Sequence, residues 1–128
     1  MRVLDLKTME GYKRRIMDTL LEKKLQAKGA VLIEGPKWCG KTTTAEEIAA
    51  SKIMLSKPDI KEHFKSLLEI DTDAALAGEA PMLIDEWQTV PKLWDAVRYT
   101  VDHRHKMGQF ILTGSAVPDK EAEKEREH

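Results

Sequence analysis

The feature that most constrains this 128-residue sequence is a glycine-rich segment at residues 35–42. It matches the pattern G-x-x-x-x-G-K-[ST], in which backbone N–H groups surround a phosphate. The apolar run at 30–33 predicts a short buried strand before the segment, and residues 43–50 favour a helix after it. Because the pattern requires this strand, loop and helix, we expect a nucleotide-binding loop here and not a chance match.

The residue types of the segment explain how it would bind phosphate. Gly35 and Gly40 can adopt backbone angles closed to other residues, so the loop N–H groups can turn inward at a helix N-terminus. Lys41 would place a charge on the outer phosphates, and the Thr42 hydroxyl suits a magnesium ion. The predicted nucleotide-binding residues are Gly35, Pro36, Lys37, Trp38, Cys39, Gly40, Lys41, Thr42 and Thr43.

A second informative stretch, residues 81–87, is an apolar run that ends in Asp85 and Glu86. We expect a parallel strand with both acids at its carboxyl end, where open α/β sheets bind ligands. Asp85 would hold the magnesium ion, as a Walker-B acid does, and Glu86 would polarise the attacking water. The alternative is an acidic strand end with a capping role; the position of the pair after Lys41 favours the catalytic interpretation.

The remaining chain alternates helical and strand patterns. The expected helices are 12–28, 60–68 and 90–104, with further helical turns at 71–77, and the expected strands are 52–55 and 109–112. Asp59 is a candidate N-cap, Pro91 a candidate first helical residue, and Trp94 a core residue and not a ligand platform. Residues 1–11 are interpreted as an arm or lead-in, 1–118 as one core domain, and 119–128 as a disordered or solvated tail.

Small polar residues follow the last expected strand, at Thr113, Gly114 and Ser115. Such residues can hydrogen-bond a γ-phosphate or its water, or they can simply form a turn. We favour the phosphate-sensing role for Thr113.

Composition narrows the class of protein. The net charge of −1 gives no argument for a nucleic-acid or membrane surface, and no apolar run is long enough to cross a bilayer. The single cysteine, Cys39, excludes an internal disulfide and fits a reducing compartment. No signal peptide opens the sequence, so we expect a cytoplasmic protein. Cys39 is either a regulatory thiol or, as we favour, a spacer. The chain has no asparagine, so the Asn-Lys-x-Asp guanine-reading motif of GTPases is absent.

Three segments together resemble one family: Gly-Pro-Lys-Trp-Cys-Gly-Lys-Thr-Thr-Thr-Ala, Leu-Ile-Asp-Glu-Trp-Gln and Phe-Ile-Leu-Thr-Gly-Ser-Ala. They are similar to the prokaryotic AAA-like P-loop ATPases (AAA+/STAND-like) that are usually fused to a C-terminal domain of unknown function. The resemblance implies a three-layer α/β/α sandwich with a mainly parallel sheet, and ATP with Mg²⁺ as cofactors. It also implies Walker A at 35–42, Walker B at 82–86, Glu86 as catalytic base, Thr113 as sensor 1, and adenine contacts from 12–15.

The chain departs from the family after Thr113, where longer members supply a fifth strand and an arginine-bearing segment. We therefore expect about four strands in the order 5-1-4-3-2 without strand five, which would leave the phosphate-loop strand on an open edge. That edge would allow self-association, and a missing C-terminal domain or partner chain would complete the site. Arg98 and Arg104 could replace the missing arginine only in an oligomer.

The leading hypothesis is an ATPase core that binds ATP and ADP and hydrolyses MgATP with Lys41, Glu86 and Thr113 as catalytic residues. The alternative is a nucleotide-binding switch or scaffold with little turnover. A small-molecule kinase would need a lid of arginines that the sequence does not show. Binding of nucleic acid is left open by the sequence.

Overall fold

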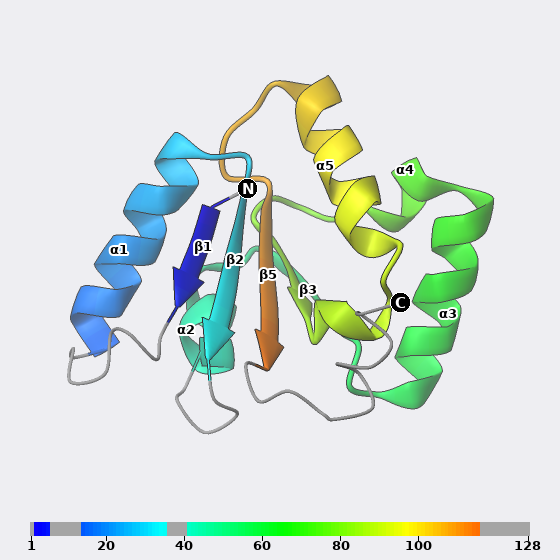
Figure 1. Ribbon diagram of the computed structural model, residues 1–128, viewed down its shortest axis with the longest axis horizontal. Coiled ribbons are helices and arrows are strands. Elements are labelled where there is room, and N and C mark those ends of the chain that lie inside the picture. Colours follow the sequence, from blue (N-terminus) through cyan, green and yellow to red (C-terminus); the bar gives the residue numbers. More distant parts are fainter. Residues whose placement is uncertain (1, 6–13, 36–40, 116–128) are drawn as a thin grey trace, which may run out of the picture.

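A parallel β-sheet forms the centre of the chain (Figure 1). The computed structural model describes residues 2–5, 14–35 and 41–115, and for residues 2–5, 14–17 and 41–43 it describes the backbone alone. Within these ranges the sheet has five strands, in the order β1-β2-β5-β4-β3, and all neighbours are parallel. The strands are β1 (Arg2–Asp5), β2 (Ala30–Gly35), β3 (Ser51–Met54), β4 (Met82–Asp85) and β5 (Phe110–Ser115).

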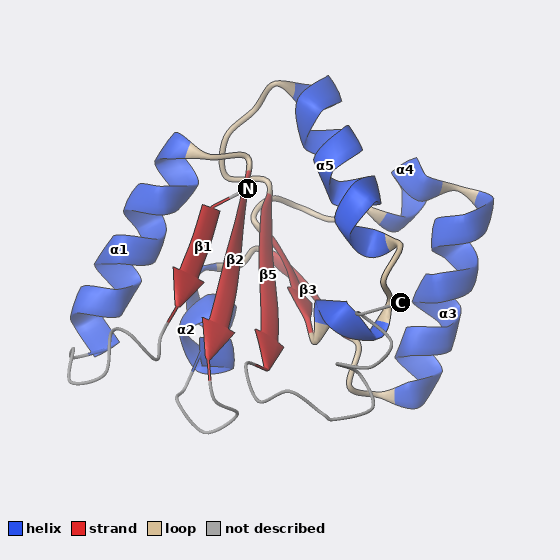
Figure 2. Ribbon diagram, viewed as in Figure 1, coloured by secondary structure: helices blue, strands red, loops and turns tan. Residues whose placement is uncertain are grey.

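Helices cover both faces of the sheet (Figure 2). One face carries α1 (Arg14–Ala27) and α2 (Lys41–Ile48), and the other carries α3 (Pro58–Ile70), α4 (Thr72–Ala75) and α5 (Leu93–Arg104). A short 3₁₀ helix, η1 (Trp87–Thr89), follows β4. The structure therefore confirms the predicted three-layer α/β/α architecture.

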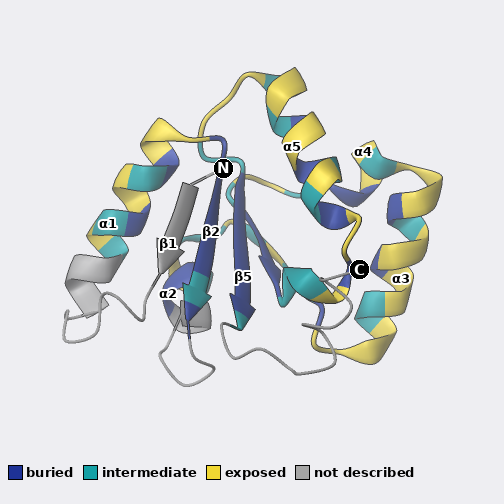
Figure 3. Cartoon of the chain, viewed as in Figure 1, coloured by how far each residue is buried: buried dark blue, intermediate teal, exposed yellow. Residues whose placement is uncertain are grey.

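The apolar residues of the central strands alternate between the two helical layers. In β2, Val31 and Ile33 pack with Leu21 of α1, whereas Ala30 and Leu32 pack in the larger cluster on the opposite face. Figure 3 shows β2, β4 and β5 buried along most of their length. A strand that is buried on both faces has a continuous apolar sequence. The sequence therefore predicts these strands.

Local chain geometry corrects two details of the prediction. The N-cap of α3 is Lys57, with Pro58 in the first turn, so Asp59 is not the cap. Pro91 precedes α5 by two residues, because residues 87–89 form η1 and the helix begins only at Leu93. Trp94, as predicted, is partly buried against the larger core cluster.

The neighbour order of the four predicted strands is confirmed, but the expected open edge beside the phosphate-loop strand is wrong. β1 pairs with β2 in parallel, from Arg2 opposite Val31 to Asp5 opposite Glu34. A buried central strand with an unpaired edge would leave backbone N–H and C=O groups without partners. The segment interpreted as an arm supplies those partners, so β1 occupies the place where strand five was expected.

Candidate functional site

The carboxyl ends of β2, β4 and β5 meet at one edge of the sheet (Figure 1). The register places Ile33 of β2 and Asp85 of β4 on either side of Thr113 of β5. Gly35, the last residue of β2, pairs with Ser115. The fold thus brings the start of the glycine-rich segment, the acidic pair and the small polar residues to adjacent strand ends.

The predicted strand before the glycine-rich segment and the predicted helix after it are confirmed, since β2 ends at Gly35 and α2 begins at Lys41. Five of the predicted nucleotide-binding residues lie outside the described residues: Pro36, Lys37, Trp38, Cys39 and Gly40. The backbone of Lys41, Thr42 and Thr43 forms the first turn of α2. The first turn of a helix presents N–H groups that make no bond inside the helix and carries a partial positive charge, a combination that suits an anion.

Asp85 is a buried carboxylate at the end of β4, only 6% exposed. Its Oδ1 accepts a hydrogen bond of 2.6 Å from Oγ1 of Thr113, which is fully buried. Among the described residues, Asp85 is the only charged side chain that is buried to this degree. Because a buried carboxylate is costly without hydrogen bonds, Thr113 both stabilises and orients Asp85. A contact between Thr113 and a phosphate stays a prediction.

Glu86 turns the chain sharply as it leaves the sheet. Its backbone lies in the left-handed region, with φ 58° and ψ 47°, which residues other than glycine rarely adopt. The carbonyl oxygen of Glu86 accepts hydrogen bonds from both the N–H and the hydroxyl of Thr89. These contacts close η1 and fix the direction of the chain after the acidic pair. Strained residues of this kind often lie at functional sites.

Gln88 is a site residue that sequence reasoning missed. Its Nε2 donates a hydrogen bond of 2.5 Å to Oε2 of Glu86. The sequence offered two signals, its position two residues after Glu86 and its place in the segment Leu-Ile-Asp-Glu-Trp-Gln. Neither reveals the contact, which depends on how the backbone turns after the strand. That turn comes from the left-handed conformation of Glu86, which the sequence did not reveal.

Of the remaining candidates, Arg104 has partners elsewhere in the chain, and the lead-in segment 12–15 is described only in part. Arg104 donates to the carbonyl oxygen of Leu76 at 2.8 Å and to Oε1 of Gln109 at 3.2 Å, so its guanidinium is engaged within its own chain. Of the expected adenine-contacting segment, residues 12 and 13 lie outside the described residues, and 14 and 15 begin α1.

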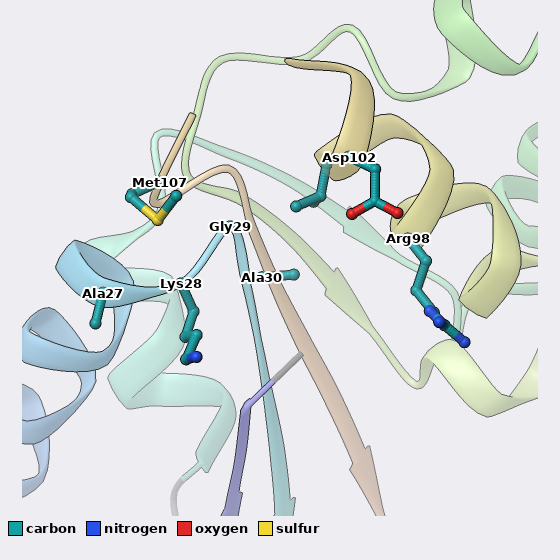
Figure 4. A pocket seen from close by; sticks show the side chains of 8 residues that line it. Ala27, Lys28, Gly29, Ala30, Arg98, Asp102 and Met107 are labelled. Atoms are coloured by element: carbon teal, nitrogen blue, oxygen red, sulfur yellow. The ribbon is translucent and has the colours of Figure 1, made fainter. Parts of the chain in front are cut away.

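A cleft of about 350 Å³ lies at the opposite end of the sheet (Figure 4). Its lining includes Lys28 and Gly29 beside the start of β2, together with Arg98 and Asp102 of α5. Lys28 and Arg98 lie on opposite sides of the cleft in Figure 4 and do not converge on one point. Because ligands of open α/β sheets bind at the carboxyl ends of the strands, we do not assign the nucleotide to this cleft.

Comparisons with known proteins agree with this geometry. Residues 27–127 match a protein family described as an AAA domain. The chain is 31% identical over 107 residues to an uncharacterized protein of Mycobacterium tuberculosis and equally to one of Mycobacterium bovis. The match covers 83% of this chain but only 24% of each relative, so the chain spans about a quarter of their length. No solved structure matches the chain significantly.

The part of the chain that the structure describes contains no helix with the length and apolar character needed to span a bilayer. The family match extends over most of the sequence, from the end of α1 through the glycine-rich segment, the acidic pair and the last strand. The fold and the clustering of these elements at one sheet edge agree with that match. The chain therefore belongs to the AAA domain family of P-loop ATPases.

Proposed function

We propose that this chain is a magnesium-dependent ATP-binding core that hydrolyses ATP. The observation that carries the proposal is the buried Asp85–Thr113 pair, which lies one strand away from the β2–α2 junction. A hydrogen-bonded carboxylate at the carboxyl end of a parallel strand suits a cation. The nearby N-terminus of α2 suits the phosphate that the cation accompanies. Membership of the AAA domain family supports nucleotide binding in general.

Each residue of the site has a proposed role. The N–H groups of the glycine-rich segment bind the phosphates, and the Lys41 ammonium neutralises their charge. Glu86 orients the attacking water and takes its proton. Thr113 keeps the Asp85 carboxylate in one orientation through their hydrogen bond.

The residues present fit a magnesium ion, because Asp85 and Thr42 offer the carboxylate and hydroxyl oxygens that Mg²⁺ prefers. The Asp85 carboxylate is already oriented by Thr113, as an outer partner orients a metal ligand. When bound, the ion would neutralise charge on the phosphate oxygens.

The binding experiment is a titration with ATP and Mg²⁺ on the wild-type chain and on Lys41→Ala. We expect the variant to bind at least about tenfold more weakly, equivalent to about 1.4 kcal/mol. Lys65→Ala is the matched control, since Lys65 is an exposed lysine of α3. If the dissociation constant of Lys41→Ala stays within about threefold of the wild type, the phosphate-loop assignment is wrong.

Hydrolysis is tested with Glu86→Gln, which keeps the size of the side chain and removes the base. We expect ATP binding to be retained and kcat to fall about 10²- to 10⁴-fold. An unchanged kcat would remove Glu86 from the mechanism. If the wild-type chain binds ATP without turnover, the alternative of a nucleotide-binding switch or scaffold replaces the ATPase proposal.

Two wider features stay proposals. Residues outside this chain, from a further domain or a partner, would complete the site, since the relatives are much longer than this chain. The cytoplasmic location expected from the sequence also stays a proposal. Pairing of two chains through β2 is not proposed, because β1 already covers that strand.

A further inference from the structure

We propose that Gln88 is a positioning residue that holds the Glu86 carboxylate for catalysis. The inference rests on the proposed function, in which Glu86 is the base. The contact that carries it is the hydrogen bond from Nε2 of Gln88 to Oε2 of Glu86. Both side chains are half-buried, so water competes for this bond less than it would on an open surface.

Hydrogen bonds and a ring contact hold the backbone around this contact. The N–H and hydroxyl of Thr89 bind the carbonyl oxygen of Glu86, and the N–H of Val90 binds that of Trp87. The Trp87 ring also packs on Trp94 of α5, with the ring centroids 5.1 Å apart. Gln88 therefore projects from a turn that is anchored at both ends, and its amide reaches Glu86 without a rearrangement of the chain.

Gly114 of β5 makes room for the other end of the Gln88 amide. A Cβ atom at position 114 would lie 2.8 Å from Oε1 of Gln88 and 2.9 Å from Nε1 of Trp87. Real Cβ atoms do not approach other atoms so closely, so the missing side chain at Gly114 is what lets η1 pack against β5. Gly114 directly follows Thr113, so the residue that packs against Gln88 is next in the chain to the residue that hydrogen-bonds Asp85.

The orientation of the amide follows from its surroundings. A flipped amide would place Oε1 against the carboxylate of Glu86, bringing two acceptors together. In the observed orientation the donor faces the carboxylate, and Oε1 is buried with no hydrogen-bond partner among the described residues. The hydrogen bond to the Glu86 carboxylate therefore fixes which way round the Gln88 amide lies.

Gln88 acts through Glu86 and does not itself touch the reacting atoms. The hydrogen bond removes rotational freedom from the carboxylate before substrate binds. Misplacement of a catalytic group by about 1 Å can slow a reaction by about 10²-fold, so loss of this restraint lowers kcat and leaves ATP affinity unchanged.

The first test is Gln88→Met, which keeps the length and volume of the side chain and removes the amide. We expect kcat to fall about 10- to 100-fold, with the KM and the dissociation constant of ATP within about twofold of the wild type. Gln26→Met is the matched control, because Gln26 is exposed on α1. A merely structural role would weaken binding together with kcat, and that result would overturn the proposal.

The second test is a double-mutant cycle with Glu86→Gln. If Gln88 acts only through Glu86, adding Gln88→Met to Glu86→Gln slows hydrolysis no further. If the double variant is slower than Glu86→Gln by the same factor that Gln88→Met shows alone, the two residues act independently and the proposal is wrong.

The third test does not depend on turnover. The chain has three glutamines and no asparagine, so only three side-chain NH₂ pairs arise in a nitrogen–proton NMR spectrum. Gln88→Met identifies the Gln88 pair by its loss. We expect Glu86→Ala to move that pair upfield and to leave the pairs of Gln26 and Gln109 in place.

The outcomes separate the two proposals. An unmoved Gln88 pair shows that the contact is not formed, which overturns the positioning role even if the chain hydrolyses ATP. A shifted pair in a chain that does not hydrolyse ATP refutes the proposed function, and a role for Gln88 in hydrolysis falls with it.

Discussion

The hydrogen bond between Thr113 and Asp85 leads to a quantitative prediction about stability. Thr113→Val replaces the hydroxyl with a methyl group of similar size, so it creates no cavity in the fully buried site. It removes the donor that lies 2.6 Å from Oδ1 of Asp85. The buried carboxylate would then lose one hydrogen bond that water cannot readily replace.

The expected magnitude follows from the charge of the acceptor. Hydrogen bonds to charged groups contribute about 1.5–3 kcal/mol, against about 1 kcal/mol for neutral pairs. We therefore expect Thr113→Val to lower the free energy of unfolding by about 2 kcal/mol. For a domain of this size, that loss lowers the Tm by roughly 6–10 °C.

Urea unfolding followed by circular dichroism measures this change, because the midpoint shifts while the slope stays constant. Thr100→Val is a matched control. Thr100 is also buried, at 4% exposed, but its hydroxyl has no hydrogen-bond partner among the described residues. We expect Thr100→Val to leave stability unchanged or raised. If Thr113→Val costs no more than Thr100→Val, the bond to Asp85 contributes nothing net and the reasoning fails.

Three further predictions concern other strained or closely packed positions. Glu86→Gly should be more stable than Glu86→Ala by about 1 kcal/mol in thermal unfolding. Both variants lose the carboxylate, but only glycine adopts φ 58° without strain. Equal stabilities would show that the left-handed turn is not strained. Gly29→Ala should lower the free energy of unfolding by about 1–3 kcal/mol, since its Cβ would lie 2.2 Å from Cγ1 of Val101. Adding Val101→Ala should recover part of that stability. If it recovers none, the clash with Val101 is not the cause. Asp71→Ala should cost about 1 kcal/mol in urea unfolding, because Oδ1 of Asp71 accepts the N–H of Ala74 at the start of α4; an unchanged midpoint would contradict the cap.

Local patterns in the sequence predicted most of the fold. The apolar runs at 30–33 and 109–112 are strands because both of their faces are buried between helical layers. The glycine-rich segment predicted the junction of β2 and α2, because its spacing specifies a strand, a loop and a helix in sequence. Such features depend on neighbours in the chain, so they are visible before the tertiary structure is known.

Long-range pairing was less accessible. β1 is only four residues long, and the sequence did not show that it would pair with β2 across α1. The sequence allows Arg104 to replace the missing arginine only in an oligomer, but the fold gives its guanidinium the carbonyl oxygen of Leu76, 28 residues away. Both outcomes depend on which segments the fold brings together, and short segments carry too little pattern to reveal that.

For the candidate site, the sequence by itself determined the chemical groups. The glycines and Lys41 for phosphate, the acids Asp85 and Glu86, and the small polar Thr113 are all visible from residue type and spacing. Only the tertiary structure decided their partners. Strand register set Thr113 against Asp85, and a left-handed turn at Glu86 brought Gln88 back to its carboxylate. A motif specifies which groups are present, whereas hydrogen bonds across strands and turns depend on backbone geometry that forms only when the whole sheet assembles.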